Sequence, residues 1–217
     1  RYFKVMRGVG VFSFFYLGAL VYGLLLVPLV AMLSRSREVR RKRLHRAITT
    51  GFRWTLALLR WTRIFDFDPR RVVVDTQGPP VIVVANHPST LDVVGVLSVY
   101  SQAVVVVKRK IWHHRMLNLM FRHTEHIPGP TGSAHDGLRV LDDIKDRLAR
   151  GYSVVVFPEG TRSPKGGLDI MQKGAFMAAT ATGTELQPVL ITCTPSALHR
   201  EAPWHELPAE PIRYRIK

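Results

Sequence analysis

Residues 81–92 read Val-Ile-Val-Val-Ala-Asn-His-Pro-Ser-Thr-Leu-Asp, and this stretch decides the fold expected for the chain. It begins with a continuous apolar run after a Gly-Pro-Pro turn, the pattern of a strand that is buried on both faces of a sheet. A polar turn and a segment with helical character follow. We therefore predict strand, turn and helix, with His87 at the carboxyl end of the strand, where ligands bind in open α/β sheets.

His87 and Asp92 are suited to act as a catalytic pair. An imidazole at this place can accept a proton from a hydroxyl, and a carboxylate one helical turn further on can hold its ring and stabilise the imidazolium. The alternative is structural, because Ser89-x-x-Asp92 also fits a capping box in which Asp92 only satisfies backbone N–H groups. A second polar turn at 157–163, Phe-Pro-Glu-Gly-Thr-Arg-Ser, favours the catalytic interpretation, since it also follows an apolar strand and can meet the first turn at one sheet edge.

The second turn contains groups that are suited to an anion. Gly160 permits close backbone approach, and the Arg162 guanidinium is a bidentate donor suited to phosphate. Glu159 is expected to orient Arg162 or to accept a hydrogen bond from a hydroxyl. Alternatively, Glu159 and Arg162 form an exposed turn pair that adds little to stability. Lys108, in the basic run that ends the apolar segment 103–107, is a further candidate for phosphate, with a solvated loop as its alternative.

Together the two motifs, Asn-His-x4-Asp at 86–92 and Phe-Pro-Glu-Gly-Thr-Arg-Ser at 157–163, resemble those of the glycerolipid acyltransferase family (1-acylglycerol-3-phosphate O-acyltransferase-like). The resemblance extends from Val72 to Ile191. It implies that His87 deprotonates the hydroxyl of the acceptor, which attacks an acyl thioester, and that Asp92 supports the histidine. It also implies substrate-binding positions, which are Asn86 and Ser89 in the first motif and Glu159, Gly160, Thr161 and Arg162 around the acceptor's phosphate.

The implied function is a membrane-bound O-acyltransferase that moves a fatty acyl group from acyl-CoA or acyl-carrier protein to a lysophospholipid, most simply lysophosphatidate to phosphatidate. The family implies no acyl-enzyme, no bound cofactor and no metal. One departure concerns the acceptor, because members that use glycerol phosphate usually carry an arginine between the motifs where residues 126–130 here read His-Ile-Pro-Gly-Pro. Another lipid-linked hydroxyl is therefore an open alternative, and the candidates to replace the arginine are Lys108, Arg115, Arg122 and Lys173.

An uncharged apolar segment occupies residues 9–33. A helix of this length exceeds the apolar core of a bilayer, which is roughly 30 Å thick. The denser basic cluster follows the segment, at residues 35–46, so the positive-inside rule places the rest of the chain in the cytoplasm, at a bacterial inner membrane. The main prediction is a transmembrane helix, and the alternative is a helical hairpin in one leaflet, bent at Gly23 or Pro28. A cleaved signal peptide is disfavoured by the length of the run.

Beyond the anchor, residues 38–64 predict a basic amphipathic helix, whose Trp54 and Trp61 suit the headgroup level of a membrane. We therefore divide the chain into a membrane-anchoring unit, 1–64, and a catalytic domain, 65–217. In that domain strands alternate with helices, which predicts an α/β fold with a mixed, mostly parallel sheet flanked by helices. The expected strands are 71–75, 81–85, 103–107, 152–157, 186–191 and 212–216, and the expected helices are 90–100, 112–121, 133–150 and 167–183.

The charge balance indicates a polyanionic partner, because 31 Lys and Arg residues stand against 16 Asp and Glu in a chain of 217 residues. The basic residues concentrate beside the apolar segment and no nucleic-acid-binding motif is present, so we expect membrane lipids and not nucleic acid. The single cysteine, Cys193, excludes an intrachain disulfide and lies in an apolar segment that indicates packing. No metal site is expected, because no carboxylate or cysteine joins His113, His114, His123 and His126 at ligand spacing.

Two other functional classes fit parts of the pattern. A non-catalytic membrane lipid-binding protein would keep the anchor and the basic face without needing His87, and a wide separation of His87 and Asp92 would favour it. A membrane-associated hydrolase would use His87 on water, and dependence of the product on an acceptor lipid would exclude it.

Overall fold

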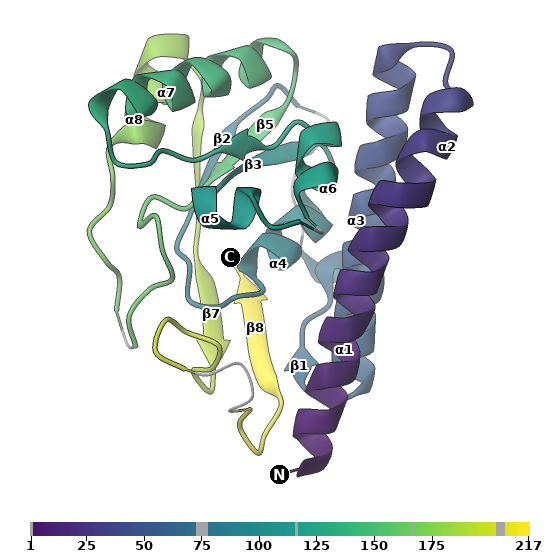
Figure 1. The fold of residues 1–217 in the computed structure, drawn as a ribbon. Coiled ribbons are helices and arrows are strands. Elements are labelled where there is room, and N and C mark those ends of the chain that lie inside the picture. Colours follow the sequence, from purple (N-terminus) through teal and green to yellow (C-terminus); the bar gives the residue numbers. More distant parts are fainter. Residues whose placement is uncertain (1, 73–77, 116, 166, 203–206) are drawn as a thin grey trace.

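The computed structural model describes residues 2–72, 78–115, 117–165, 167–202 and 207–217, and its centre is a parallel sheet (Figure 1). The described strands of this sheet follow the order β4-β3-β5-β2-β6, and every neighbouring pair is parallel. A smaller sheet has the order β1-β8-β7, with β8 parallel to β1 and antiparallel to β7. The predicted α/β fold with a mixed, mostly parallel sheet is therefore confirmed. The strands are β1 (Phe65–Asp66), β2 (Ile82–Ala85), β3 (Ala103–Val107), β4 (Ile127–Pro128), β5 (Ser153–Val156), β6 (Leu186–Val189), β7 (Ile191–Thr194) and β8 (Ile212–Ile216).

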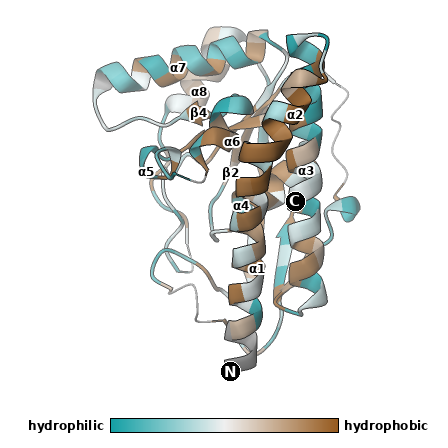
Figure 2. Ribbon diagram, turned by 45° about the vertical axis from the view of Figure 1, so that its right-hand side comes forward, coloured by the Kyte–Doolittle hydropathy of each residue, from teal (hydrophilic) through white to brown (hydrophobic). Residues whose placement is uncertain are grey.

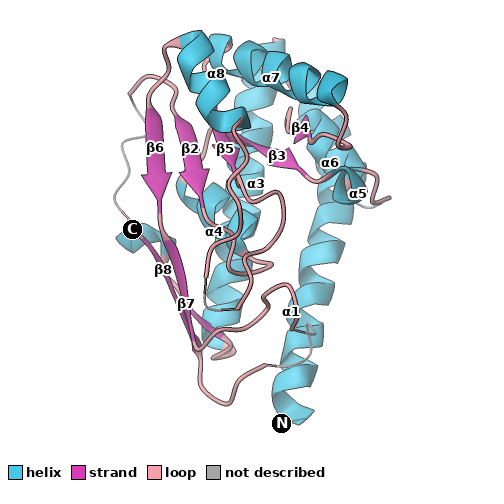
Figure 3. Ribbon diagram, turned by 90° about the vertical axis from the view of Figure 1, so that its left-hand side faces the viewer, coloured by secondary structure: helices cyan, strands magenta, loops and turns pink. Residues whose placement is uncertain are grey.

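Helices cover both faces of the larger sheet, as Figure 3 shows. Successive residues of a strand point to opposite faces, and here both faces are buried, which explains why the strands are continuous apolar runs. Val83 and Val155 join a core with α3 (Arg37–Trp61) and α4 (Asp92–Val99). Ile82 and Val154 join a second core with α7 (Ala134–Ala149) and α8 (Gly174–Thr182). The helices of the domain are α4 (Asp92–Val99), α5 (Arg109–Trp112), α6 (Asn118–His123), α7 (Ala134–Ala149) and α8 (Gly174–Thr182).

The amino-terminal part forms two antiparallel arms that lie along the domain. One arm is continuous from α1 (Tyr2–Val21) through the π-helical turn η1 (Tyr22–Leu26) to α2 (Val27–Met32). The chain reverses at residues 33–36, and α3 (Arg37–Trp61) returns beside the first arm. A hairpin bent at Gly23 or Pro28 is therefore wrong, because the helix continues through both residues, with the π-helical turn directly before α2 and Pro28.

The first arm remains long and apolar enough to cross a membrane, with a mean hydropathy of 2.2 over a window within Met6–Met32. The ribbon of α1 and α2 is largely brown, that is apolar, in Figure 2. Several of these apolar residues are exposed, among them Leu17, Leu24 and Met32. The returning arm, α3, buries its apolar stripe against the domain and leaves Trp54 and Trp61 exposed.

Several element predictions are corrected by the structure. The strand predicted at 71–75 is not observed at its start, because Arg71 ends the 3-10 turn η2 (Pro69–Arg71). Residues 73–75 of this prediction lie outside the described residues. The predicted helix 112–121 is two short helices, α5 and α6, and the helix predicted from residue 167 begins only at Gly174. On α7, Val140, Ile144 and Leu148 form the packed face, and Leu138 is 58% exposed.

The predicted strand 186–191 is divided at Leu190, and this division shapes the site. β6 pairs with β2 in the larger sheet, whereas β7 pairs with β8 in the smaller one. The Asn86 amide joins the two sheets, because its Nδ2 donates to the Ile191 carbonyl at 2.9 Å and its Oδ1 accepts from the Ile191 N–H at 2.6 Å. The turn that carries His87 is thereby fixed between the sheets.

Candidate active site

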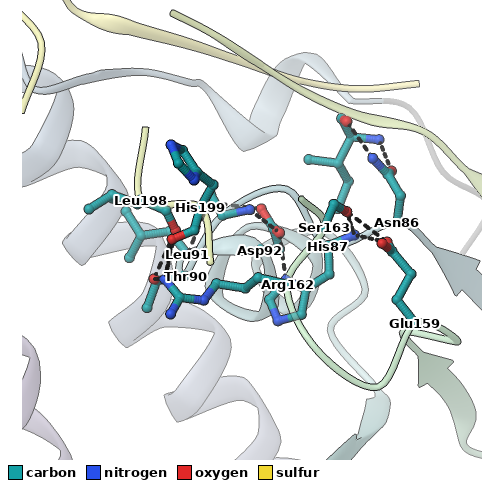
Figure 4. A network of polar contacts seen from close by, with 12 residues as sticks. Asn86, His87, Thr90, Leu91, Asp92, Glu159, Arg162, Ser163, Leu198 and His199 are labelled. Carbon is teal, nitrogen blue, oxygen red and sulfur yellow. Dashed lines mark hydrogen bonds and ion pairs between the residues drawn. The ribbon is translucent and has the colours of Figure 1, made fainter. Parts of the chain in front are cut away.

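His87 and Asp92 meet at the carboxyl end of β2, where Figure 4 shows them side by side. Nδ1 of His87 lies 2.7 Å from Oδ2 of Asp92, and the Asp92 side chain has 0% exposure. A carboxylate only accepts hydrogen bonds, so Nδ1 carries the proton and Nε2 is left as the basic nitrogen. The wide separation that would have favoured a non-catalytic protein is therefore not observed.

Asp92 also has the capping role that the sequence left as an alternative. Its Oδ2 accepts from the Ser89 N–H at 2.7 Å, and its Oδ1 accepts from the Ser89 hydroxyl at 2.9 Å. The two interpretations are compatible, because one carboxylate both closes the turn and holds the imidazole. Ser89 itself is fully buried and its hydroxyl also accepts from the Leu91 N–H. Substrate binding by Ser89 does not fit this geometry, since its side chain is closed off from solvent.

The His87 ring is held on its face as well as at Nδ1. The Phe157 ring lies 4.5 Å from it, centroid to centroid, with a 30° angle between the planes. The His87 side chain keeps 18% exposure. In the described part of the chain, Nε2 makes no hydrogen bond to protein, so the ring is oriented with one nitrogen open to a ligand. No pattern in the sequence indicates this contact, although Phe157 belongs to the second motif.

Glu159 holds the backbone of the first motif by a hydrogen bond to its carboxylate. Its side chain is 6% exposed, and Oε1 accepts from the His87 N–H at 3.0 Å and from the Ser163 hydroxyl at 2.7 Å. Oε2 accepts from the Asp169 N–H at 2.8 Å. None of these bonds involves Arg162, so the expectation that Glu159 orients Arg162 is wrong, whereas the alternative bond from a hydroxyl is formed by Ser163. Ser163, which the sequence analysis did not single out, also donates its N–H to the His87 carbonyl at 2.7 Å.

Arg162 binds other parts of the chain. Its Nη1 lies 2.9 Å from the Thr90 hydroxyl and 2.9 Å from the carbonyls of Leu198 and His199 (Figure 4). The guanidinium thus links the second motif, the start of the first motif's helix and the loop after β7. Within the described residues, its Nε and Nη2 donate to no protein acceptor. These two atoms are the part of Arg162 that can still meet an anion.

The remaining predicted residues surround this centre less closely. The Asn86 amide exchanges two hydrogen bonds with the Ile191 backbone, which leaves it little capacity to bind substrate. Gly160 has φ +64°, a conformation that other residues rarely adopt, and lies exposed in the turn beside half-buried Thr161. Lys108 is exposed at the end of β3, which is separated from β2 by β5. Lys108 therefore lies at the predicted edge, with no protein contact to fix its ammonium in the described chain.

The turn that lacks the family's arginine is reached by an arginine from elsewhere. Arg139, on α7, donates Nη2 to the Pro128 carbonyl at 3.1 Å. Its guanidinium also pairs with Asp143 at 3.0 Å and with Asp136 at 3.5 Å, so these carboxylates compensate its charge. Of the four replacement candidates, Lys108, Arg115 and Lys173 are exposed, and Arg122 lies on α6 before β4, at the opposite edge of the sheet.

The surroundings of Cys193 do not favour a nucleophilic thiolate. It is half-buried on β7, and burial together with the nearby Asp92 charge raises the pKa of its thiol to about 12. The thiolate that nucleophilic chemistry needs is therefore disfavoured at neutral pH. Among the described residues, no group of three or more His, Cys, Asp or Glu side chains is arranged to hold a metal ion.

The chain is similar in sequence to known acyltransferases. The family model described as "Acyltransferase" matches residues 70–192, which include both motifs. A 1-acyl-sn-glycerol-3-phosphate acyltransferase of Chlamydomonas reinhardtii is 30% identical over 55% of this chain and 36% of its own length. The beta enzyme of the same name from Homo sapiens is 29% identical over 57% of this chain and 44% of its own length. The matched part thus spans less than half of these curated relatives.

A solved structure shares the fold over nearly the whole chain. The 1-acyl-sn-glycerophosphate acyltransferase PlsC of Thermotoga maritima superposes with a TM-score of 0.70 and 24% identity, over 99% of this chain and 86% of that one. Its likeness includes the amino-terminal arms as well as the sheet.

Proposed function

This chain belongs to the acyltransferase family, and on that premise we propose that it transfers a fatty acyl group from an acyl thioester to the hydroxyl of a lysophospholipid. The predicted membership of this family is thereby confirmed. The observation that carries the proposal is the contact of 2.7 Å between His87 Nδ1 and the buried Asp92 carboxylate, at the sheet edge where ligands bind. The relatives' names make lysophosphatidate the first acceptor to test and phosphatidate its product.

The proposed reaction needs one proton shuttle. Nε2 of His87 removes the proton from the acceptor hydroxyl, and the oxygen attacks the thioester carbonyl. The tetrahedral intermediate then expels the thiolate, which takes the proton back from the imidazolium. Asp92 keeps Nδ1 protonated and stabilises the imidazolium, as the aspartate does in a catalytic triad. No covalent enzyme intermediate is required, in keeping with the high thiol pKa of Cys193.

The acceptor's phosphate is assigned to the second motif. Nε and Nη2 of Arg162 offer donors there, and Gly160 lets backbone approach closely. The carbonyl contacts of Nη1 hold the guanidinium in one orientation, which suits recognition of a fixed anion. Acyl-CoA or acyl-carrier protein serves as donor in this proposal. A lipid-linked hydroxyl without a glycerol-phosphate headgroup is the second candidate acceptor, favoured by compensation of the Arg139 charge at the 126–130 turn.

We also propose that the first arm lies along the membrane surface and does not cross the bilayer. The arm approaches the rest of the chain closely at two points along its length: a Cβ at Gly8 would lie 3.2 Å from Leu207, and one at Gly23 would lie 3.0 Å from Leu119. The α3 arm runs alongside and contains charged residues along its length. A crossing arm would draw these charges into hydrocarbon, at about 2.5–3.5 kcal/mol for each one near the centre. The cytoplasmic leaflet of a bacterial inner membrane is the proposed location.

The activity is tested by acyl transfer in vesicles, with labelled acyl-CoA and acyl-carrier protein as donors and a panel of lysolipids as acceptors. Wild-type protein should form diacyl product only when an acceptor is present, and His87→Ala should abolish it while membrane association and thermal unfolding stay unchanged. Product formation by the His87→Ala variant would overturn the proposal. Release of fatty acid without dependence on acceptor would instead identify a hydrolase.

The membrane arrangement is tested separately by cysteine labelling in a Cys193→Ser background. Single cysteines at Met6 and Met32 would be reacted with a membrane-impermeant maleimide added to one side of sealed vesicles. A surface arm predicts that both positions react from the same side. Reaction of the two positions from opposite sides would show a spanning helix.

A further inference from the structure

A second candidate site lies near the amino-terminal ends of the parallel strands in the larger sheet, whereas His87 lies at their carboxyl ends. A cavity of about 910 Å³ is formed where the start of α3 meets the ends of α6 and α7. Arg150 and Glu125, which line it, come shortly before β5 and β4, and so mark the amino-terminal ends of the parallel strands. His87 follows the carboxyl end of β2, so the cavity and the candidate active site are separate. Five arginines line this cavity: Arg37, Arg40, Arg41, Arg122 and Arg150.

The positive charge of the cavity is mostly uncompensated. Of the two carboxylates that line it, Glu38 pairs with Lys42 at 2.8 Å. Glu125 pairs with Arg150 and Arg147. In the described ranges of the chain, the other four arginines of the cavity have no carboxylate within ion-pair distance. The Arg41 guanidinium lies over the Tyr152 ring, 4.5 Å from its centroid, which positions the cation without neutralising it.

Two histidines lie close enough to the arginines of the cavity that the arginine charges contribute to their pKa values. Burial, and next the charge of Arg40, lower the pKa of His123. Burial, and next the charge of Arg41, lower the pKa of His45 to about 4. Burial is the larger cause in both histidines, the arginine charges add to it, and the Glu125 carboxylate opposes the shift at His45. An anion that enters it meets several arginine forks, which bind phosphate oxygens bidentately.

The cavity adjoins the exposed apolar end of the first arm. Met32 is 85% exposed and Leu33 is 64% exposed, and the chain reaches Arg37 after a turn of four residues, 33–36. An apolar surface followed directly by a basic cavity is complementary to a lipid, whose acyl chains and phosphate are joined in the same way. A free phosphate would use only the second of these surfaces.

We propose that the arginine cavity binds the phosphate headgroup of an anionic phospholipid that is not the substrate being acylated. The acyl chains of this lipid lie against the end of α2, and its phosphodiester is held by Arg40, Arg41 and Arg122. This bound lipid fixes the end of the first arm that is distant from the amino terminus.

The test is co-sedimentation of the full chain with vesicles of phosphatidylcholine alone and of phosphatidylcholine mixed with phosphatidylglycerol. Wild-type protein should bind the mixed vesicles more tightly. Arg40→Gln/Arg41→Gln should reduce this gain in affinity about thirtyfold, because each of the two basic residues near anionic lipid adds a factor of roughly five. The matched control, Arg213→Gln/Lys217→Gln, removes the same charge from exposed positions on β8 and the chain end, and should change the gain less than about twofold.

Two further variants separate a cavity from diffuse attraction. Arg40→Lys/Arg41→Lys keeps the charge but loses the fork geometry, so it should also bind the mixed vesicles more weakly. Arg122→Gln changes an exposed residue and leaves the contact between Arg41 and the Tyr152 ring intact. This variant should therefore fold normally and lose part of the additional affinity for the mixed vesicles. Circular dichroism and thermal unfolding would confirm the folding of each variant.

Equal losses in the cavity variants and in the Arg213/Lys217 control would overturn the proposal in favour of diffuse electrostatics. Complete competition by inorganic phosphate at matched ionic strength would show a site for free phosphate and not for lipid. Acyl transfer in neutral detergent micelles should be unchanged in Arg40→Gln/Arg41→Gln, and its loss there would place these arginines in the active site and contradict a separate lipid site.

Discussion

The backbone N–H of His87 donates a hydrogen bond to Oε1 of Glu159 across 3.0 Å, and thereby the second motif holds the first in place. The same carboxylate accepts from the Ser163 hydroxyl and the Asp169 N–H. Glu159 therefore supports the turn that carries the candidate base, and the three donors that converge on it explain why a carboxylate is suited to this position. Its contribution to catalysis is expected to pass through the placement of His87.

Glu159→Gln should destabilise the protein and lower kcat together. An amide can accept at one position only, so its NH2 group must face either the His87 N–H or the Asp169 N–H. We expect a loss of about 1–3 kcal/mol in the free energy of unfolding, the usual cost of an unsatisfied buried donor. Urea unfolding in detergent measures this loss. The matched change Glu185→Gln, at an exposed position, should stay within about 0.5 kcal/mol. A stable but inactive Glu159→Gln would instead indicate direct contact with substrate.

Asp92→Asn should separate catalysis from capping. Asparagine can still accept from His87 Nδ1 and from the Ser89 N–H with its single oxygen, while the Ser89 hydroxyl rotates to accept from the new amide. The charge that stabilises the imidazolium is lost, so kcat should fall about 10²- to 10⁴-fold, and less than in His87→Ala. Thermal unfolding should change little. A large loss of stability with kcat preserved would mean that Asp92 is only a cap.

Arg162→Lys should raise the KM for the acceptor more than it lowers kcat. Lysine keeps the positive charge but cannot reach the Thr90 hydroxyl, the Leu198 carbonyl and an external phosphate with one planar fork. We expect an increase in KM of about tenfold, the value of one charge-assisted hydrogen bond. Steady-state kinetics with varied lysophospholipid measures it. An unchanged KM with a lowered melting temperature would limit Arg162 to tying the loops together.

Stability should fall as the pH falls from about 6.5, because two buried histidines stay neutral in the folded protein. Burial, and next the Arg41 charge, lower the pKa of His45 to about 4. Burial, with the charges of His45 and Arg147, lowers the pKa of His126 to about 3. Between these values and 6.5 the unfolded chain binds more protons than the folded one. Each histidine therefore removes about 1.4 kcal/mol per pH unit in this window.

Urea unfolding of wild-type protein from pH 7.5 down to pH 4.5 would show this slope. His45→Gln should lower the slope by the share of one histidine, whereas His135→Gln, at an exposed position, should leave it unchanged. A wild-type stability that is flat across the window would contradict the assignment.

Gly95→Ala should destabilise the helix that begins at Asp92. A Cβ at Gly95 would lie 2.8 Å from the Tyr214 hydroxyl oxygen, and Tyr214 is only 1% exposed. Overpacking of this kind costs about 1–3 kcal/mol. Tyr214→Phe removes that oxygen, which is buried and makes no hydrogen bond of normal geometry within the described residues, so the single change should cost less than about 1 kcal/mol.

The double variant Gly95→Ala/Tyr214→Phe should recover part of the loss, and a double-mutant cycle in urea gives the coupling energy between the two sites. Strict additivity of the two single changes would show that the hydroxyl moves aside without cost.

Much of the domain follows from local patterns in the sequence. The apolar runs at 81–85, 103–107 and 152–157 are strands because a residue buried on both sheet faces must be apolar whichever way it points. Parallel strands bring their carboxyl ends to one edge, so the meeting of His87 with the second motif also follows from the sequence. The pair His87 and Asp92 needed only the five-residue spacing within one turn.

The tertiary structure decided which polar groups pair across that edge. Arg162 finds its carbonyl acceptors at Leu198, 36 residues away, and the His87 N–H finds Ser163, 76 residues away. Such partners depend on how two sheets and their loops are placed, and no periodic pattern encodes them. The reversal of the first arm at 33–36 and the gathering of arginines at the far edge were likewise fixed by packing, because each buries apolar surface that is contributed by distant segments.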